Sequence, residues 1–359
     1  MRAVGNCEIG ENRLPNLLPR GPLYPSAVVV ALSPTWGRMR LLMNVINCAL
    51  EREVGGRVFV HGGSTWAEEV PLDFSDNSNP LGPPPEVEEA LRLAAERGVH
   101  RRFPAHLVEE VLAEYEGVEV TVFNGATDAL LHALLDLKPR RLVVPWPSYG
   151  DYLRLAELLG VAALKIPPWR LEAVRPGDVV VLANPNNPLG YHWPRDAVLD
   201  YADQLRRRGA KLLVDESFLD FARGETAAPE IPVAKSYGKF LAAPGLRLGA
   251  LLYRHRAPPP WRINSMADYA VYAAGASALR RHRERTLQYL AQEKPRFEAA
   301  LKRCAAYLPS AVHFYTVLGP PPPGIKSRPL LDKGVQGFRV SLKNPQMNDL
   351  LTRAICKNI

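Results

Sequence analysis

The segment Ile231–Leu252, IPVAKSYGKFLAAPGLRLGALL, places Lys239 between two apolar runs. The runs IPVA and LRLGALL predict short buried strands, so Lys239 is expected in the turn that joins them. Gly238 and Gly245 allow tight backbone there. An ammonium group in apolar surroundings loses solvation, which lowers its pKa and makes the amine a usable nucleophile. Because most lysines near strands simply reach the surface, a chemical role for Lys239 depends on the partners that the rest of the chain supplies.

Length and composition narrow the class of protein. The 359 residues allow two domains, and 47% hydrophobic and 23% charged residues are typical of a globular protein. No apolar run is long enough to span a bilayer and no secretory signal is evident, which predicts a cytoplasmic protein without a membrane partner. The net charge is +8, but the basic residues lack interleaved aromatics, which favours solvated helix faces over nucleic-acid binding.

The cysteines and the first residues carry weaker signals. The spacing of the four cysteines predicts no metal site, and free thiols are the default expectation, with a disulfide between the last two as the alternative: Cys7, Cys48, Cys304 and Cys356. Residues 1–42 have no clear period. They are expected to be an N-terminal extension, either a flexible arm or an over-extended gene start with Met43 as the initiator.

Apolar strands alternate with helices over residues 86–255, which predicts an α/β domain: a mostly parallel sheet with helices on both faces. Residues 43–85 are expected to form an N-terminal arm. The segment PPPWRINS, Pro258–Ser265, indicates a domain joint, so residues 256–359 are expected to form a smaller α+β domain that starts with a long helical region to about Ala306.

Three motifs place polar groups at the ends of predicted strands. In FNGATDAL, a strand, a sharp turn and a helix expose backbone N–H groups that would hold a phosphate, an ordinary helix cap being the alternative: Gly125, Ala126 and Thr127. ANPNNPLG places Asn187 at the edge where open α/β sheets bind ligands. LLVDES ends in Asp215, whose buried carboxylate needs a cation, either Lys239 or a protonated ring nitrogen.

The motifs NGAT, NPNNPLG, VDESFLDF and SYGKFLAAPGLRLG, in this order, resemble the fold-type-I pyridoxal-phosphate enzymes, the aspartate aminotransferase superfamily. The resemblance covers the chain from about His61 to the C-terminus. It implies an enzyme that binds pyridoxal 5'-phosphate and forms a homodimer.

The resemblance also implies roles for individual residues. Lys239 would form the Schiff base with the cofactor and shuttle protons, while Asp215 would pair with the pyridinium nitrogen. Asn187 would donate to the ring hydroxyl oxygen, and Tyr149 would stack on the ring unless it is only a half-buried aromatic at a strand end. The cofactor phosphate would be bound by the turn of the NGAT motif and by two further side chains: Ser236 and Arg247.

Two positions depart from the superfamily pattern. Phe218 stands three residues after Asp215, where relatives often have a tyrosine that donates to the ring hydroxyl. Phe103 stands before a proline, where relatives commonly have a tyrosine contributed across the dimer interface. Both changes remove a hydroxyl donor and leave the implied core machinery intact.

Two subgroups fit, the L-threonine-O-3-phosphate decarboxylases of cobalamin biosynthesis and the histidinol-phosphate aminotransferases. The HGG at His61 and the Phe218 substitution resemble the decarboxylases more, so we expect decarboxylation of L-threonine O-3-phosphate, with an aminotransferase using 2-oxoglutarate as the alternative. The implied substrate contacts are His61, Asn79, Arg328 and Arg339; for His61 a surface turn is the alternative. A regulator that keeps this fold as a binding module is the non-enzyme alternative, but residues 1–42 are too short and patternless for a DNA-binding domain.

Overall fold

The computed structural model describes residues 61–357, so the expectations for residues 1–42, Met43, Cys7 and Cys48 lie outside the described residues. The helices of this part are α2 (Pro85–Glu96), α3 (Val108–Glu116), α4 (Ala126–Leu137), α5 (Asp151–Leu158), α6 (Arg195–Arg207), α7 (Ser265–Leu301) and α8 (Pro345–Lys357). The strands are β1 (Thr121–Asn124), β2 (Arg141–Pro145), β3 (Ala162–Ile166), β4 (Asp178–Ala183), β5 (Lys211–Asp215), β6 (Val233–Ser236), β7 (Leu248–Leu251), β8 (Phe314–Leu318), β9 (Arg328–Pro329) and β10 (Gly337–Ser341).

The larger sheet has the order β1-β7-β6-β5-β4-β2-β3. Strands β2 to β6 pair in parallel, and only β7 runs antiparallel to its neighbours β1 and β6. Ser236 on β6 pairs with Gly249 on β7, so Lys239 lies in the connection between these strands, as predicted. The mostly parallel sheet is therefore confirmed.

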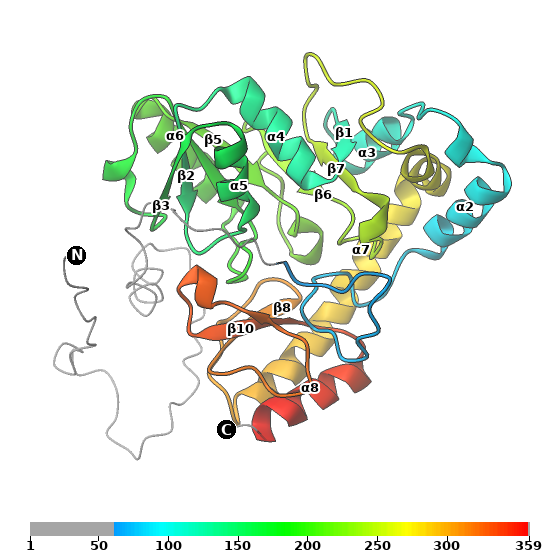
Figure 1. Ribbon diagram of the computed structural model, residues 1–359, viewed down its shortest axis with the longest axis vertical. Helices are drawn as coiled ribbons and strands as arrows, with labels where there is room; N and C mark the ends of the chain where they lie inside the picture. Colours follow the sequence, from blue (N-terminus) through cyan, green and yellow to red (C-terminus); the bar gives the residue numbers. More distant parts are fainter. Residues whose placement is uncertain (1–60, 358–359) are drawn as a thin grey trace.

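Both faces of this sheet are buried, because successive residues of a strand point to opposite faces. On β4, Val180 packs into one apolar core and Val181 into another. The first core also contains residues of α6 and α7, and the second contains residues of α4 and α5. Figure 1 shows these helices around the sheet. This arrangement leaves the carboxyl ends of the parallel strands as the edge where ligand-binding groups can gather.

A smaller antiparallel sheet, β8-β10-β9, follows the long helix α7, which links the two parts of the molecule in Figure 1. Helix α7 has a break at Gly275, with φ 77°, and ends at Leu301, short of the expected Ala306 because the chain turns there. Cys304, in this turn, forms a disulfide with Cys356 on α8. The default expectation of free thiols was wrong for this pair.

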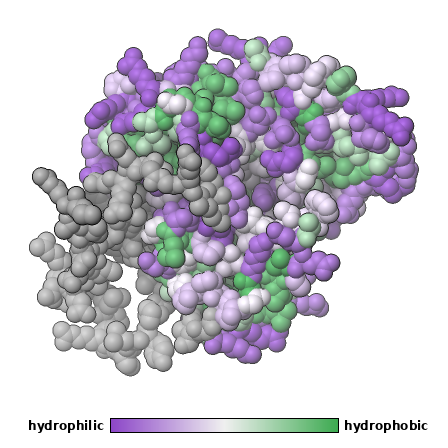
Figure 2. All heavy atoms as spheres, in the orientation of Figure 1, coloured by the Kyte–Doolittle hydropathy of each residue, from purple (hydrophilic) through white to green (hydrophobic). Residues whose placement is uncertain are grey.

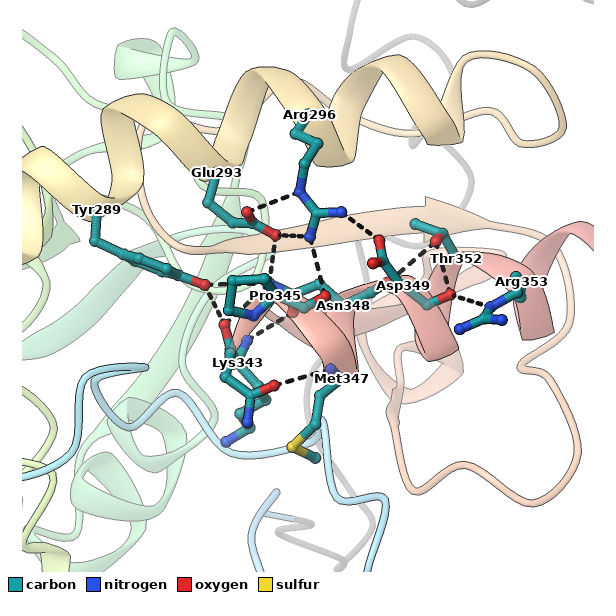
Figure 3. Close-up of polar contacts among 11 residues, drawn as sticks. Tyr289, Glu293, Arg296, Lys343, Pro345, Met347, Asn348, Asp349, Thr352 and Arg353 are labelled. Atoms are coloured by element: carbon teal, nitrogen blue, oxygen red, sulfur yellow. Dashed lines mark hydrogen bonds and ion pairs between the residues drawn. The ribbon is translucent and has the colours of Figure 1, made fainter.

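A polar network fastens α8 to α7 (Figure 3). Asn348 donates to Glu293 at 2.8 Å and to the carbonyl of Lys343 at 2.9 Å, and it accepts from the Lys343 amide at 2.8 Å. The Lys343 ammonium lies 2.8 Å from a carboxylate oxygen of Asp76, near the Lys239 loop. The network thus connects the packing of two helices to the segment that follows β10.

Hydrophilic residues dominate the face shown in Figure 2, and hydrophobic residues form separate patches on it. The exposed large hydrophobic side chains include Phe103, which stacks on Trp261 with ring centroids 4.3 Å apart. Within residues 61–357, no helix is both long and apolar enough to cross a membrane.

Candidate active site

A cavity lies at the carboxyl ends of the parallel strands, where the N-terminal segment and the smaller sheet also meet. It brings together most of the residues predicted from the motifs: His61, Ala126, Thr127, Tyr149, Asn187, Asp215, Ser236, Lys239, Arg247, Arg328 and Arg339. Gly125 and Asn79 do not line it. Phe218, which replaces the expected tyrosine, does line it.

Lys239 lies in the wall of the cavity, in the connection between β6 and β7. Within the described residues, no carboxylate lies within ion-pair distance of its amine. Burial lowers the pKa of Lys239, and the more distant Asp76 opposes this shift. A lysine that carries less positive charge is the form that can react with an aldehyde.

Asn79 holds the Lys239 loop instead of a substrate. Its side-chain amide donates to the Phe240 carbonyl at 3.0 Å and to Thr286 at 2.8 Å, and its backbone N–H donates to the carbonyl of Lys239 at 2.9 Å. With its donors engaged and its side chain buried outside the cavity lining, Asn79 cannot contact a substrate in this arrangement. The structure therefore corrects the expectation for this residue.

Asp215 ends β5 with a buried carboxylate that accepts two hydrogen bonds. The Tyr152 hydroxyl donates at 2.7 Å and the Ser217 N–H at 2.9 Å. No cation of the described part of the chain lies within ion-pair distance, so the alternative of a Lys239–Asp215 ion pair is wrong. Burial raises the pKa of Asp215, and a protonated ring nitrogen would supply the missing charge.

The first turn of α4 forms a cradle with Arg247. Gly125 has a φ of 89°, and a Cβ there would lie 2.4 Å from the Arg247 guanidinium, so the close approach requires glycine. A Cβ at Gly249 on β7 would likewise lie 2.3 Å from the backbone nitrogen of Ala126. The positive end of α4 and the guanidinium of Arg247 lie together here, which makes the turn a suitable site for a phosphate.

Asp151, at the start of α5, was missed by the sequence motifs. Its carboxylate accepts from the hydroxyls of Tyr149 at 3.0 Å and Thr127 at 3.1 Å, and it lies 3.2 Å from the imidazole of His61. Burial alone would raise its pKa, but His61 and Arg154 lower it to about 2. One carboxylate thus positions three predicted site residues, and its place two residues after Tyr149 was the available signal.

Two arginines of the smaller sheet enter the other end of the cavity. Arg339 on β10 donates to the side-chain carbonyl of Asn187 at 2.6 Å and to the backbone carbonyl of Ser75. Burial lowers the pKa of Arg339 to about 10. Arg328 on β9 is held by Asp332 through bonds of 3.0 and 2.7 Å. Only Arg339 of the two lacks a carboxylate within ion-pair distance among residues 61–357.

The aminotransferase class I and II family model matches residues 69–324. The chain belongs to this family. It is 32% identical over 265 residues to the threonine-phosphate decarboxylase of Salmonella typhimurium, a match that covers 64% of this chain and 71% of the relative. It is 30% identical over 322 residues to the histidinol-phosphate aminotransferase of Rubrobacter xylanophilus, covering 79% and 91%. The Sinorhizobium meliloti histidinol-phosphate aminotransferase, solved with pyridoxal-5'-phosphate, has the same fold at a TM-score of 0.67 and 22% identity, covering 79% and 89%.

Membership of this family makes the chain a pyridoxal-phosphate enzyme, and the cavity agrees with that cofactor. The buried carboxylate of Asp215 lacks a cation among the described residues, and the start of α4 lines the cavity together with the Arg247 guanidinium. Lys239 lines the same cavity. Asp215 thus matches the ring nitrogen of the cofactor, the Arg247 cradle matches its phosphate, and Lys239 matches its aldehyde.

Proposed function

We propose that this enzyme decarboxylates L-threonine O-3-phosphate to (R)-1-aminopropan-2-yl phosphate and CO2. The observation that carries the proposal is that His61 and Phe218, the two positions that resemble the decarboxylases, line the cavity together with the buried guanidinium of Arg339, which has no carboxylate partner in the described part of the chain. A buried cation without a counter-ion is costly, so an anionic substrate is its natural partner. The likeness to the threonine-phosphate decarboxylase of Salmonella typhimurium supports the same reaction.

Pyridoxal phosphate, when bound, supplies an electron sink for the bond that breaks at the substrate Cα. Decarboxylation breaks the bond between Cα and the carboxylate carbon, and a proton takes the place of the lost CO2. Lys239, the lysine that the motif assigns to the cofactor, lies in the cavity wall with a lowered pKa, so its amine would deliver this proton. The carboxylate of Asp215 would hold a proton at the ring nitrogen, and Asn187 would donate its side-chain N–H groups to the ring oxygen.

The anion contacts would decide which bond at Cα breaks, because only a bond perpendicular to the cofactor ring overlaps its π system. A decarboxylase has to leave the carboxylate perpendicular and anchor the substrate elsewhere. A phosphate group bound by His61, Arg328 and Arg339 would provide that anchor. If Arg339 gripped the carboxylate instead, the Cα–H bond would be exposed and transamination would follow.

An aminotransferase acting on histidinol phosphate with 2-oxoglutarate is the second candidate. The relative from Rubrobacter xylanophilus favours it, because that match covers more of both chains than the decarboxylase match does. Both candidates use a phosphorylated amino compound, so the same arginines serve either reaction.

The two candidates are separated by offering the purified holoenzyme O-phospho-L-threonine and, separately, histidinol phosphate with 2-oxoglutarate. CO2 release from the first substrate alone supports the decarboxylase. Glutamate formation from the second, without CO2 from the first, contradicts it. Arg339→Lys serves as the matched variant, since it keeps the charge but loses the bidentate geometry.

A homodimer is part of the proposal. The exposed Phe103, stacked on Trp261, offers an apolar surface that a second copy of the chain would cover. Light scattering of the wild type against Phe103→Glu measures this directly. A monomeric wild type would contradict it.

A further inference from the structure

Lys333 lines the active-site cavity, and no sequence motif assigns it a role. It ends the short helix η5 (Leu331–Lys333), between β9 and β10. Its ammonium nitrogen lies 4.6 Å from the ring centroid of Trp146, and its carbonyl accepts from the indole N–H at 3.1 Å. Trp146 follows β2, so a residue of the larger sheet fixes both the backbone and the side chain of Lys333.

The charges at this end of the cavity do not balance. Arg328, Lys333 and Arg339 carry three positive charges. Asp332 is the one carboxylate of the described residues within ion-pair distance of any of them, at 2.7 Å from Arg328 and 3.7 Å from Lys333. Three cations thus share one carboxylate, which leaves a net surplus of two positive charges among these four residues.

A surplus of two charges suits a phosphate group better than a carboxylate. A phosphate monoester carries about −1.5 to −2 at neutral pH, whereas a carboxylate carries one charge. Lys165 on β3 adds a further cation, 4.3 Å from the centroid of the same Trp146 ring, but it does not line the cavity. Of the two lysines that contact the Trp146 indole, only Lys333 therefore lines the cavity.

The environment of Lys333 also makes the protonation of its amine sensitive to a bound anion. Burial lowers its pKa to about 8; Arg328 and Lys165 add to this effect, and Asp332 opposes it. These are the charged groups that face its amine from β9, β3 and its own helix. A bound dianion would favour the protonated amine, so affinity and charge at this position are coupled.

We infer that Lys333 binds the phosphate group of the substrate together with Arg339 and sets the preference for phosphorylated over unphosphorylated amino acids. The inference rests on the proposed function only in that the substrate carries a phosphate. It does not depend on which bond at Cα is broken. Arg328, already held by Asp332, serves as the rigid edge of this anion site.

The test titrates the holoenzyme with O-phospho-L-threonine and with L-threonine, following the visible absorbance of the cofactor. Lys333→Met should weaken binding of O-phospho-L-threonine by about 10- to 100-fold, as expected for one charge-assisted contact, and should change L-threonine binding by less than about twofold. Lys165→Met is the matched control: it removes a lysine from the same indole outside the cavity, and we expect less than about a threefold effect.

The dependence on pH separates binding from a merely structural role. Above about pH 8 Lys333 loses its charge in the free enzyme, so wild-type affinity for O-phospho-L-threonine should decrease there more steeply than that of Lys333→Met. Equal losses for both ligands, or parallel pH profiles, would overturn the inference. Wild type that binds both ligands equally would also overturn it. Preferential binding without CO2 release would leave the anion site intact and reject only the decarboxylase.

Discussion

Two lysines four residues apart, Lys235 on β6 and Lys239 after it, illustrate how surroundings determine the role of a residue. The ammonium of Lys235 lies 2.7 Å from Glu116 and 3.0 Å from Asp220, both buried. Burial would lower its pKa, but the two carboxylates raise it. Lys239 has no such partner among the described residues, and burial lowers its pKa.

The difference between the two pKa shifts follows from the groups that surround each side chain. Lys235 points into a polar cluster where Tyr115 and Tyr237 also donate to its two carboxylates. That cluster holds a permanently charged ammonium, which is a structural role. Lys239 faces the cavity, where its partners would be a cofactor and a substrate.

The largest expected effect is at Lys239. Lys239→Ala should lower kcat by about 10⁴-fold or more, because the chain loses both its covalent attachment point and its proton donor. The measurement is turnover together with the visible absorption of the bound cofactor. Retention of covalently attached cofactor after borohydride reduction would contradict the assignment.

Lys235→Met tests the other side of the comparison. It should lower the free energy of unfolding by about 3–5 kcal/mol, because Glu116 would be left buried without a cation and Asp220 would keep only Arg283, at 3.8 Å. Chemical denaturation measures this, with Lys239→Met as the control, for which we expect less than about 1 kcal/mol. Adding Glu116→Gln and Asp220→Asn should recover part of the loss; no recovery would argue against the ion pairs as its cause.

Asp215→Asn should lower kcat by about a hundredfold or more, or about 2.7 kcal/mol, since an amide cannot hold the ring nitrogen protonated. Glu216→Gln is the matched control. Glu216 is also buried, burial raises its pKa to about 7, and it accepts from the Ala227 N–H outside the cavity. We expect less than about a threefold change in kcat for this control. An equal decrease of kcat in both variants would contradict the role proposed for Asp215.

The smallest expected effect is on the pH dependence of the free energy of unfolding, measured on the apoprotein. The folded-state pKa of Lys235 is raised, so its stabilisation is complete below the ordinary value of 10.5 and is lost as the pH rises further. The folded-state pKa of Lys239 is lowered, so its contribution improves as the pH approaches 10.5. The difference in unfolding free energy between wild type and Lys239→Met should rise as the pH approaches 10.5 from below, and the difference between wild type and Lys235→Met should fall above 10.5, each by less than about 1.4 kcal/mol per pH unit. Slopes of the same sign would contradict the contrast.

Local sequence was sufficient for the sheet and for the cofactor end of the cavity. Apolar runs and turn residues determine where a strand ends, and parallel strands bring their carboxyl ends to one edge. Asp215, Asn187 and Lys239 could therefore be placed together without knowing any distance. The turn at Gly125 that begins α4 belongs to the same class of local signal.

At the proposed substrate end the sequence predicted His61, Arg328 and Arg339, and the tertiary structure added residues without a motif. Asp151 and Lys333 carry no motif, and their roles come from contacts with Tyr149 and Trp146. The sequence around Asn79 predicted a substrate contact, but its side-chain amide donates to the Phe240 carbonyl and to the Thr286 hydroxyl.

The same division separates Lys235 from Lys239. Their sequence surroundings are equally apolar, and the carboxylates that distinguish them, Glu116 and Asp220, lie 119 and 15 residues from Lys235 along the chain. Burial lowers the charge of any lysine, but long-range packing determines whether a counter-charge arrives to restore it. The sequence by itself predicted the strand, the turn and Lys239 as the reactive lysine; only the fold showed that Lys235 is paired with two carboxylates.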